Sequence, residues 1–168
     1  MIWGMSAGTF TAVHVIISLI GILTGLIVVL GWLGSRNLGG LTAVFLATTI
    51  LTSVTGFGFP FDRLLPSHKL GIISLVVLAV AILAYYAFRL AGPWRWIYVV
   101  TALLALYLNV FVAVVQAFQK LAFLQPLAPT QSEPPFLIAQ IVVLVVFIGL
   151  GIVSVRRFHP AAGAIAQA

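Results

Sequence analysis

The sequence predicts an all-α integral membrane protein, built as a bundle of five transmembrane helices. Of its 168 residues, 63% are hydrophobic and only 6% are charged, and the mean hydropathy is +1.27. A soluble domain normally carries roughly 25% charged residues, so a water-soluble globule is excluded. Disorder is excluded as well, because disordered chains have low hydrophobicity. The apolar residues also fall into five runs, each close to the length of about 20 residues that crosses a bilayer.

We expect one transmembrane domain over 1–168. Its spans are predicted at about 10–33, 38–57, 67–90, 94–119 and 136–155, followed by a short, frayed tail over 156–168. Gly and Pro delimit the spans: Gly92-Pro93 separates the third from the fourth, and Pro66 precedes the third, where proline suits a helix start.

The second span is the least certain, so a bundle of four spans is the alternative. It contains five hydroxyl residues, Thr48, Thr49, Thr52, Ser53 and Thr55. Such hydroxyls can bond back to carbonyls of their own helix, and the segment can therefore still insert into a membrane.

Positive charge is distributed unevenly between the two ends of the bundle. The end that holds the N-terminus carries Arg63, Lys69 and Lys120 together with both acidic residues, Asp62 and Glu133; the opposite end carries Arg36, Arg89, Arg95, Arg156 and Arg157. Because cytoplasmic loops are enriched in Lys and Arg, we expect a bacterial-type inner-membrane protein with its N-terminus outside and its C-terminus in the cytoplasm. The expected partners are the lipid bilayer and either a second copy or a larger membrane complex. Nucleic acid is not expected, because no basic stripe with interleaved aromatics is present.

Polar side chains gather toward the N-terminal end of the predicted bundle. A pocket is predicted there, lined by Ser18, Thr52, Thr55, Asn109, Gln116 and Gln140. Such groups are costly in hydrocarbon unless they find partners, so they should converge inside the bundle. The alternative is that they only hold helices together through interhelical hydrogen bonds.

His14 and His68 are the candidate cofactor ligands. Both lie toward the N-terminal end, and an ionisable residue within a membrane span suggests a functional site. Two imidazoles from two helices suit the axial positions of haem b, and the close Gly21-xxx-Gly25 face would either admit a flat macrocycle or serve helix packing. With Asp62 and Glu133 the same histidines form a candidate divalent-metal site. Asp62, Arg63 and Glu133 are also expected to form a lid.

Three functions therefore stay open. The first is a haem or metal site in membrane electron transport, and the chain resembles small b-type membrane cytochromes such as the cytochrome b561 group in size and helical character. The second is an accessory subunit of a larger membrane complex without chemistry of its own. The third is a small transporter or channel that uses the pocket as its vestibule. An enzyme is not favoured, because the chain lacks cysteine, HExxH and GxSxG.

Overall fold

The computed structural model describes residues 1–59 and 66–161. The described residues are helical, without a β-sheet. The helices are α1 (Ala7–Leu33), α2 (Gly39–Gly56), α3 (Pro66–Ile82), α4 (Trp94–Lys120) and α5 (Pro134–Arg157). A π-helical turn, η1 (Leu83–Ala87), extends α3, and a 3-10 turn, η2 (Gln125–Leu127), lies between α4 and α5. The prediction of five helices long and apolar enough to span a membrane is confirmed.

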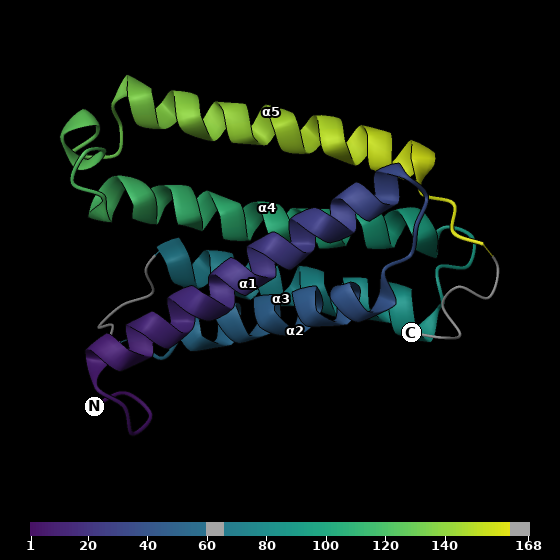
Figure 1. The fold of residues 1–168 in the computed structure, drawn as a ribbon, viewed down its shortest axis with the longest axis horizontal. Helices are drawn as coiled ribbons and strands as arrows, with labels where there is room; N and C mark the ends of the chain where they lie inside the picture. Colours follow the sequence, from purple (N-terminus) through teal and green to yellow (C-terminus); the bar gives the residue numbers. More distant parts are fainter. Residues whose placement is uncertain (60–65, 162–168) are drawn as a thin grey trace.

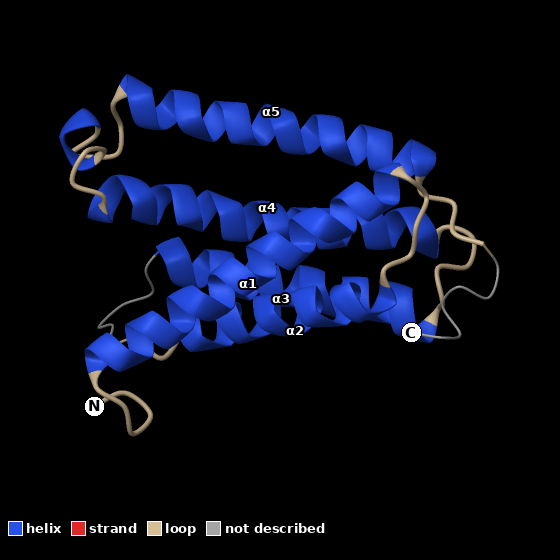
Figure 2. Ribbon diagram, viewed as in Figure 1, coloured by secondary structure: helices blue, strands red, loops and turns tan. Residues whose placement is uncertain are grey.

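Successive helices run in opposite directions and pack side by side (Figures 1 and 2). α1 packs along α2, α2 against α3, α3 against α4, and α4 against α5, while α1 also crosses α4. One end of the bundle, the N-terminal end, therefore holds the starts of α1, α3 and α5 and the ends of α2 and α4. The opposite end holds the start of α4 and the end of α5.

At the opposite end, large aromatic side chains are buried against one another. Trp32, Tyr85, Tyr98 and Phe158 are each at most 1% exposed, and the Tyr98 ring contacts the other three, with centroid distances of 5.4, 5.0 and 6.3 Å. Tyr85 lies in the π-helical turn that extends α3, a turn that the sequence did not predict.

The chain after α5 does not begin as a frayed tail. Phe158 is buried between Trp32 and Tyr98, and the amide of His159 donates to Ser35 Oγ at 2.9 Å. Arg95, at the start of α4, donates to the carbonyls of Val155 and Phe158 at 2.8 and 2.7 Å. The expectation of a frayed segment from residue 156 is therefore wrong for the described part, because the guanidinium satisfies carbonyls that a helix end leaves unpaired.

The glycine face of α1 serves packing. A Cβ atom on Gly25 would lie 2.7 Å from Leu106 Cδ1 and 2.8 Å from Phe45 Cδ2, so α4 and α2 approach this position closely. A Cβ atom on Gly21 would lie 3.1–3.4 Å from side-chain atoms of Thr48, Thr49 and Asn109. Side chains of α2 and α4 therefore pack against both glycines, which is the packing role that the sequence left open.

Candidate functional site: a cavity at the N-terminal end

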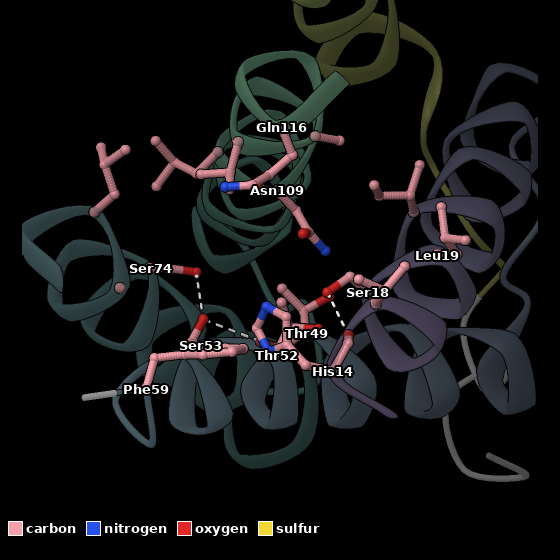
Figure 3. Close-up of a pocket in the computed structure, with 18 of the residues that line it drawn as sticks. His14, Ser18, Leu19, Thr49, Thr52, Ser53, Phe59, Ser74, Asn109 and Gln116 are labelled. Carbon is pink, nitrogen blue, oxygen red and sulfur yellow. Dashed lines mark hydrogen bonds between the residues drawn. The ribbon is translucent and has the colours of Figure 1, made fainter. Parts of the chain in front are cut away.

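A cavity of about 620 Å³ lies between α1, α2, α3 and α4 at the N-terminal end of the bundle (Figure 3). Each of these four helices contributes polar side chains to its wall, and no lining residue comes from α5. The polar lining residues are Thr11, His14, Ser18, Thr49, Thr52, Ser53, His68, Ser74, Asn109, Gln116 and Lys120. Aliphatic side chains such as Ile22, Leu108 and Val112 complete the wall.

His14 is held by a hydrogen bond between α1 and α2. Its Nδ1 atom lies 2.7 Å from Thr55 Oγ1. The Thr55 hydroxyl has a single proton, which it directs to the carbonyl of Leu51 at 2.7 Å, so Oγ1 accepts a hydrogen bond from the Nδ1–H of His14. His14 lines the cavity and Thr55 does not, so the Nε2 edge of the ring is left for an occupant, with a free lone pair in the neutral imidazole.

The hydroxyls of the cavity wall are largely turned back to their own helices. Thr11 donates to Ala7 O, Ser18 to His14 O, Thr49 to Phe45 O, Thr52 to Thr48 O and Ser53 to Thr49 O, at 2.7–3.0 Å. Because each hydroxyl has one proton, these oxygens can offer only lone pairs to the cavity.

Asn109 is the unsatisfied group of the site. The side chain is 9% exposed, and its Nδ2 donor has no hydrogen-bond partner in the described structure. Figure 3 shows it extending from α4 toward side chains of α1 and α2. The Nδ2 atom is inaccessible and lies 3.4 Å from a Cβ atom built on Gly21, so it faces the contact of α4 with α1 and α2 rather than the open cavity.

His68 enters the cavity wall from the first turns of α3. Its side chain is 4% exposed, and its ring lies 5.4 Å from the ring of Phe57, measured between centroids. The structure thus brings His14 and His68 to one cavity from two helices.

Other predicted pocket residues divide into two groups. Ser18, Thr52, Asn109 and Gln116 line the cavity, and Thr55 acts on it through His14. Gln140 does not line the cavity, and its Nε2 donates to Phe111 O at 3.2 Å. Gln140 therefore joins α5 to α4, which is the packing alternative that the sequence left open.

Among the predicted lid and metal residues, Glu133 forms hydrogen bonds only within its own turn in the described structure. Its carboxylate accepts hydrogen bonds from the Thr130 amide and hydroxyl and from the Ser132 amide, at 2.8–3.1 Å, in the turn before α5. Desolvation raises the pKa of Glu133, but these hydrogen bonds outweigh it and hold the pKa below its ordinary value. Asp62 and Arg63 lie outside the described residues. In the described part of the chain, no three His, Cys, Asp or Glu residues lie together as a metal site.

Five polar residues of the wall were not predicted as pocket residues. Ser53 and Ser74 join α2 to α3 through a hydrogen bond of 3.2 Å, while Thr11, Thr49 and Lys120 also line the cavity. Lys120 had a usable signal, because Asn109, Gln116 and Lys120 follow helical steps of seven and four residues and share a face of α4.

No protein-family model, no curated protein and no solved structure matches this chain.

Proposed function

We propose that this protein is a membrane-embedded binding protein that holds a small, largely apolar molecule in the cavity between α1, α2, α3 and α4. The observation that carries the proposal is the cavity of about 620 Å³ itself, which has aliphatic walls and is bordered by the polar side chains of His14, Asn109 and Gln116. An occupant would be oriented by hydrogen bonds to these few polar groups in an otherwise apolar site.

The composition of the wall agrees with such an occupant. Binding sites for small molecules are usually concave and mostly apolar, with a few polar groups that orient the ligand. This cavity has aliphatic walls, the Nε2 edge of His14 on one side and the amide of Asn109 on another.

Haem b is the second candidate, and a different observation favours it. His14 and His68 line the same cavity, and the hydrogen bond from His14 Nδ1 to Thr55 presets Nε2 as a ligand atom. A divalent-metal site finds less support, because Glu133 is engaged in its own turn.

The first experiment separates these candidates by thermal unfolding of the detergent-purified full chain with haem and with a panel of apolar carbonyl and hydroxyl compounds. A ligand that binds only the folded state raises the unfolding temperature, and the stabilisation grows with the logarithm of its concentration relative to Kd. A haem-loaded sample with a Soret band that sharpens on reduction, and that is lost in His14→Phe, would assign haem. A panel without a stabilising compound would contradict the proposal.

Asn109→Leu provides the sharper test. The substitution removes an unpaired buried donor at nearly constant volume, so the free energy of unfolding of the ligand-free protein should stay the same or rise by up to about 1 kcal/mol. The ligand-induced rise in unfolding temperature should shrink at the same time. Gln140→Leu is the matched control, because it removes an amide outside the cavity and should leave the ligand-induced rise intact. A destabilised Asn109→Leu protein that binds ligand normally would make Asn109 a packing residue.

A further inference from the structure

The cavity is apolar at its deep end. Ile22 of α1 and Leu108 of α4 line it farthest from the N-terminal end of the bundle. The polar side chains at this depth are turned away from the cavity, because the Thr49 hydroxyl donates to the carbonyl of Phe45 and Asn109 Nδ2 is inaccessible. The part of an occupant that reaches this depth is therefore hydrocarbon.

The outer end of the cavity carries two hydrogen-bond donors on one face of α4. Gln116 and Lys120 both line the cavity and are both exposed, and their spacing of four residues places them one turn apart on the same helix face. Lys120 has no hydrogen-bond or ion-pair partner among the described residues, and no Asp or Glu of the described chain lines the cavity. This end therefore offers an ammonium and an amide N–H to a group that accepts hydrogen bonds.

His14 of α1 lies across the cavity from Gln116 (Figure 3). The ammonium of Lys120 is close enough to His14 to act on its charge. Thr55 accepts the Nδ1 proton of the ring, so a second proton, taken up on Nε2, would make His14 another donor to the cavity. An anion between His14 and Lys120 would offset the repulsion between two neighbouring cations.

The cavity is also elongated and borders the lipid. Along α4 its lining runs from Leu108 to Lys120, about 18 Å of helix. Its volume of about 620 Å³ lies in the range of roughly 300–1,000 Å³ that is usual for small-molecule sites. Val15 and Leu19 of α1 line the same space and are 42% and 50% exposed on a helix long enough to span a membrane. A molecule dissolved in the bilayer can therefore enter past these two side chains.

We propose that the cavity takes a long-chain fatty acid, bound as the carboxylate. The inference rests on the proposed binding function and names the class of ligand. The carboxylate accepts hydrogen bonds from the Lys120 ammonium and the Gln116 amide at the outer end, and the alkyl chain runs along α4 to Leu108. An anionic phospholipid presents the same chemistry, an anionic head group on alkyl chains, and is separated from the fatty acid by competition.

Binding of palmitate, hexadecanol and methyl palmitate to the full chain in phosphatidylcholine nanodiscs tests the head group. The three compounds share their alkyl chain, and only palmitate is an anion at mildly alkaline pH. Affinity follows from the rise in unfolding temperature over a series of ligand contents in the bilayer. Palmitate should bind about three- to tenfold more tightly than either neutral compound, the effect of a charged hydrogen bond at an ammonium that solvent still reaches.

Two lysine variants locate the anion. Lys120→Gln should remove the advantage of palmitate and leave the binding of hexadecanol unchanged. Lys69→Gln is the matched control, because Lys69 is an exposed lysine at the same end of the bundle that does not line the cavity. It should retain the full preference. A general attraction of anions to this end of the protein would fall equally in both variants, and that result would overturn the site at Lys120.

A palmitate with a diazirine at the end of its alkyl chain tests the orientation. Irradiation should label residues around Ile22 and Leu108, and unlabelled palmitate should prevent the labelling. Labels confined to Lys120 and Leu121 would overturn the orientation. Labelling that dioleoylphosphatidylglycerol prevents and palmitate does not would overturn the fatty acid and assign the site to an anionic phospholipid.

The head-group comparison also separates this inference from the proposed function. Equal affinities for palmitate and hexadecanol, both unchanged in Lys120→Gln, would overturn the anionic ligand and leave the binding function standing. If neither these compounds nor the apolar panel stabilises the protein, the binding function falls as well.

Discussion

Gly25 determines how closely α1 approaches α2 and α4. An added methyl group would lie 2.7–2.8 Å from atoms of Leu106 and Phe45, far closer than van der Waals contact. Gly25→Ala should therefore lower the free energy of unfolding by about 1–3 kcal/mol, the usual cost of overpacking a close-packed core. The measurement is equilibrium unfolding of the detergent-solubilised protein.

Gly149 in α5 is the matched control for that substitution. No atom lies within 4 Å of a Cβ built on it, and it too is in a helix. Gly149→Ala should leave stability unchanged or raise it by up to about 1 kcal/mol, because alanine is the better helix former. Equal effects of the two substitutions would show that helix propensity, rather than close packing, governs both positions.

For single residues, the sequence predicted how far along its helix a side chain lies better than it predicted the direction in which that side chain points. The depths of His14, Asn109 and Gln140 followed from their positions in the spans, and these positions indicated one polar layer. The rotation of each helix decides which of them share a space, and rotation depends on the packing of all five helices. That is why Asn109 lines the cavity while Gln140 bonds the carbonyl of Phe111.

Arg95 connects the start of α4 to the end of α5. Its guanidinium donates to Val155 O and Phe158 O at 2.8 and 2.7 Å, and it holds Phe158 among the buried aromatic rings. Arg95→Gln should lower the free energy of unfolding by about 1.5–3 kcal/mol, the range for a hydrogen bond that involves a charged group. Hydrogen exchange of the last turn of α5 should become faster in this variant.

Arg156→Gln is the control for Arg95→Gln. Arg156 lies in the last turn of α5 and is exposed, so this variant loses the same charge near the same helix end but keeps both hydrogen bonds of Arg95. It should show slow exchange like the wild-type protein. Fast exchange in both variants would assign the effect to charge near the helix end and contradict the role of the two bonds.

The existence of the five helices could be predicted from hydropathy. In hydrocarbon, an apolar run bounded by Gly and Pro has few alternatives to a helix. The second helix, the least certain in sequence, forms because each of its hydroxyl residues from Thr48 to Thr55 bonds a carbonyl one turn earlier. The π-helical turn at Leu83–Ala87 and the docking of Phe158 were not predictable in this way. Tyr85 of the π-helical turn contacts Tyr98 on the next helix, and Phe158 contacts Trp32 and Tyr98, so both features involve tertiary contacts that hydropathy does not report.

Across the whole molecule, the two ends of the bundle are built differently. Large aromatic side chains fill the end that holds Trp32, Tyr85, Tyr98 and Phe158. Small hydroxyl residues and glycines at the N-terminal end, among them Ser18, Ser53, Gly71 and Ser74, leave the cavity between α1, α2, α3 and α4. Side-chain volume thus decides where the bundle is solid and where it can hold a ligand, and a ligand in the cavity would remain near one face of the membrane.

The distribution of positive charge predicts which face of the membrane that is. Because the five helices alternate in direction, the start of α1 and the end of α5 lie at opposite ends of the bundle (Figure 1). Arg36, Arg89, Arg95, Arg156 and Arg157 lie at the end that holds the C-terminus of α5, whereas Lys69 and Lys120 lie at the N-terminal end.

Because Lys and Arg near span ends are retained on the cytoplasmic side, the C-terminus should be cytoplasmic and the cavity should open in the outer leaflet. In a bacterial host, an alkaline phosphatase fused to the C-terminus should be inactive and a fluorescent protein fused there should be bright. An active phosphatase with a dark fluorescent protein would invert the orientation. The cavity and its ligand would then belong to the cytoplasmic leaflet, since the positions of His14 and Asn109 within the bundle do not depend on its orientation.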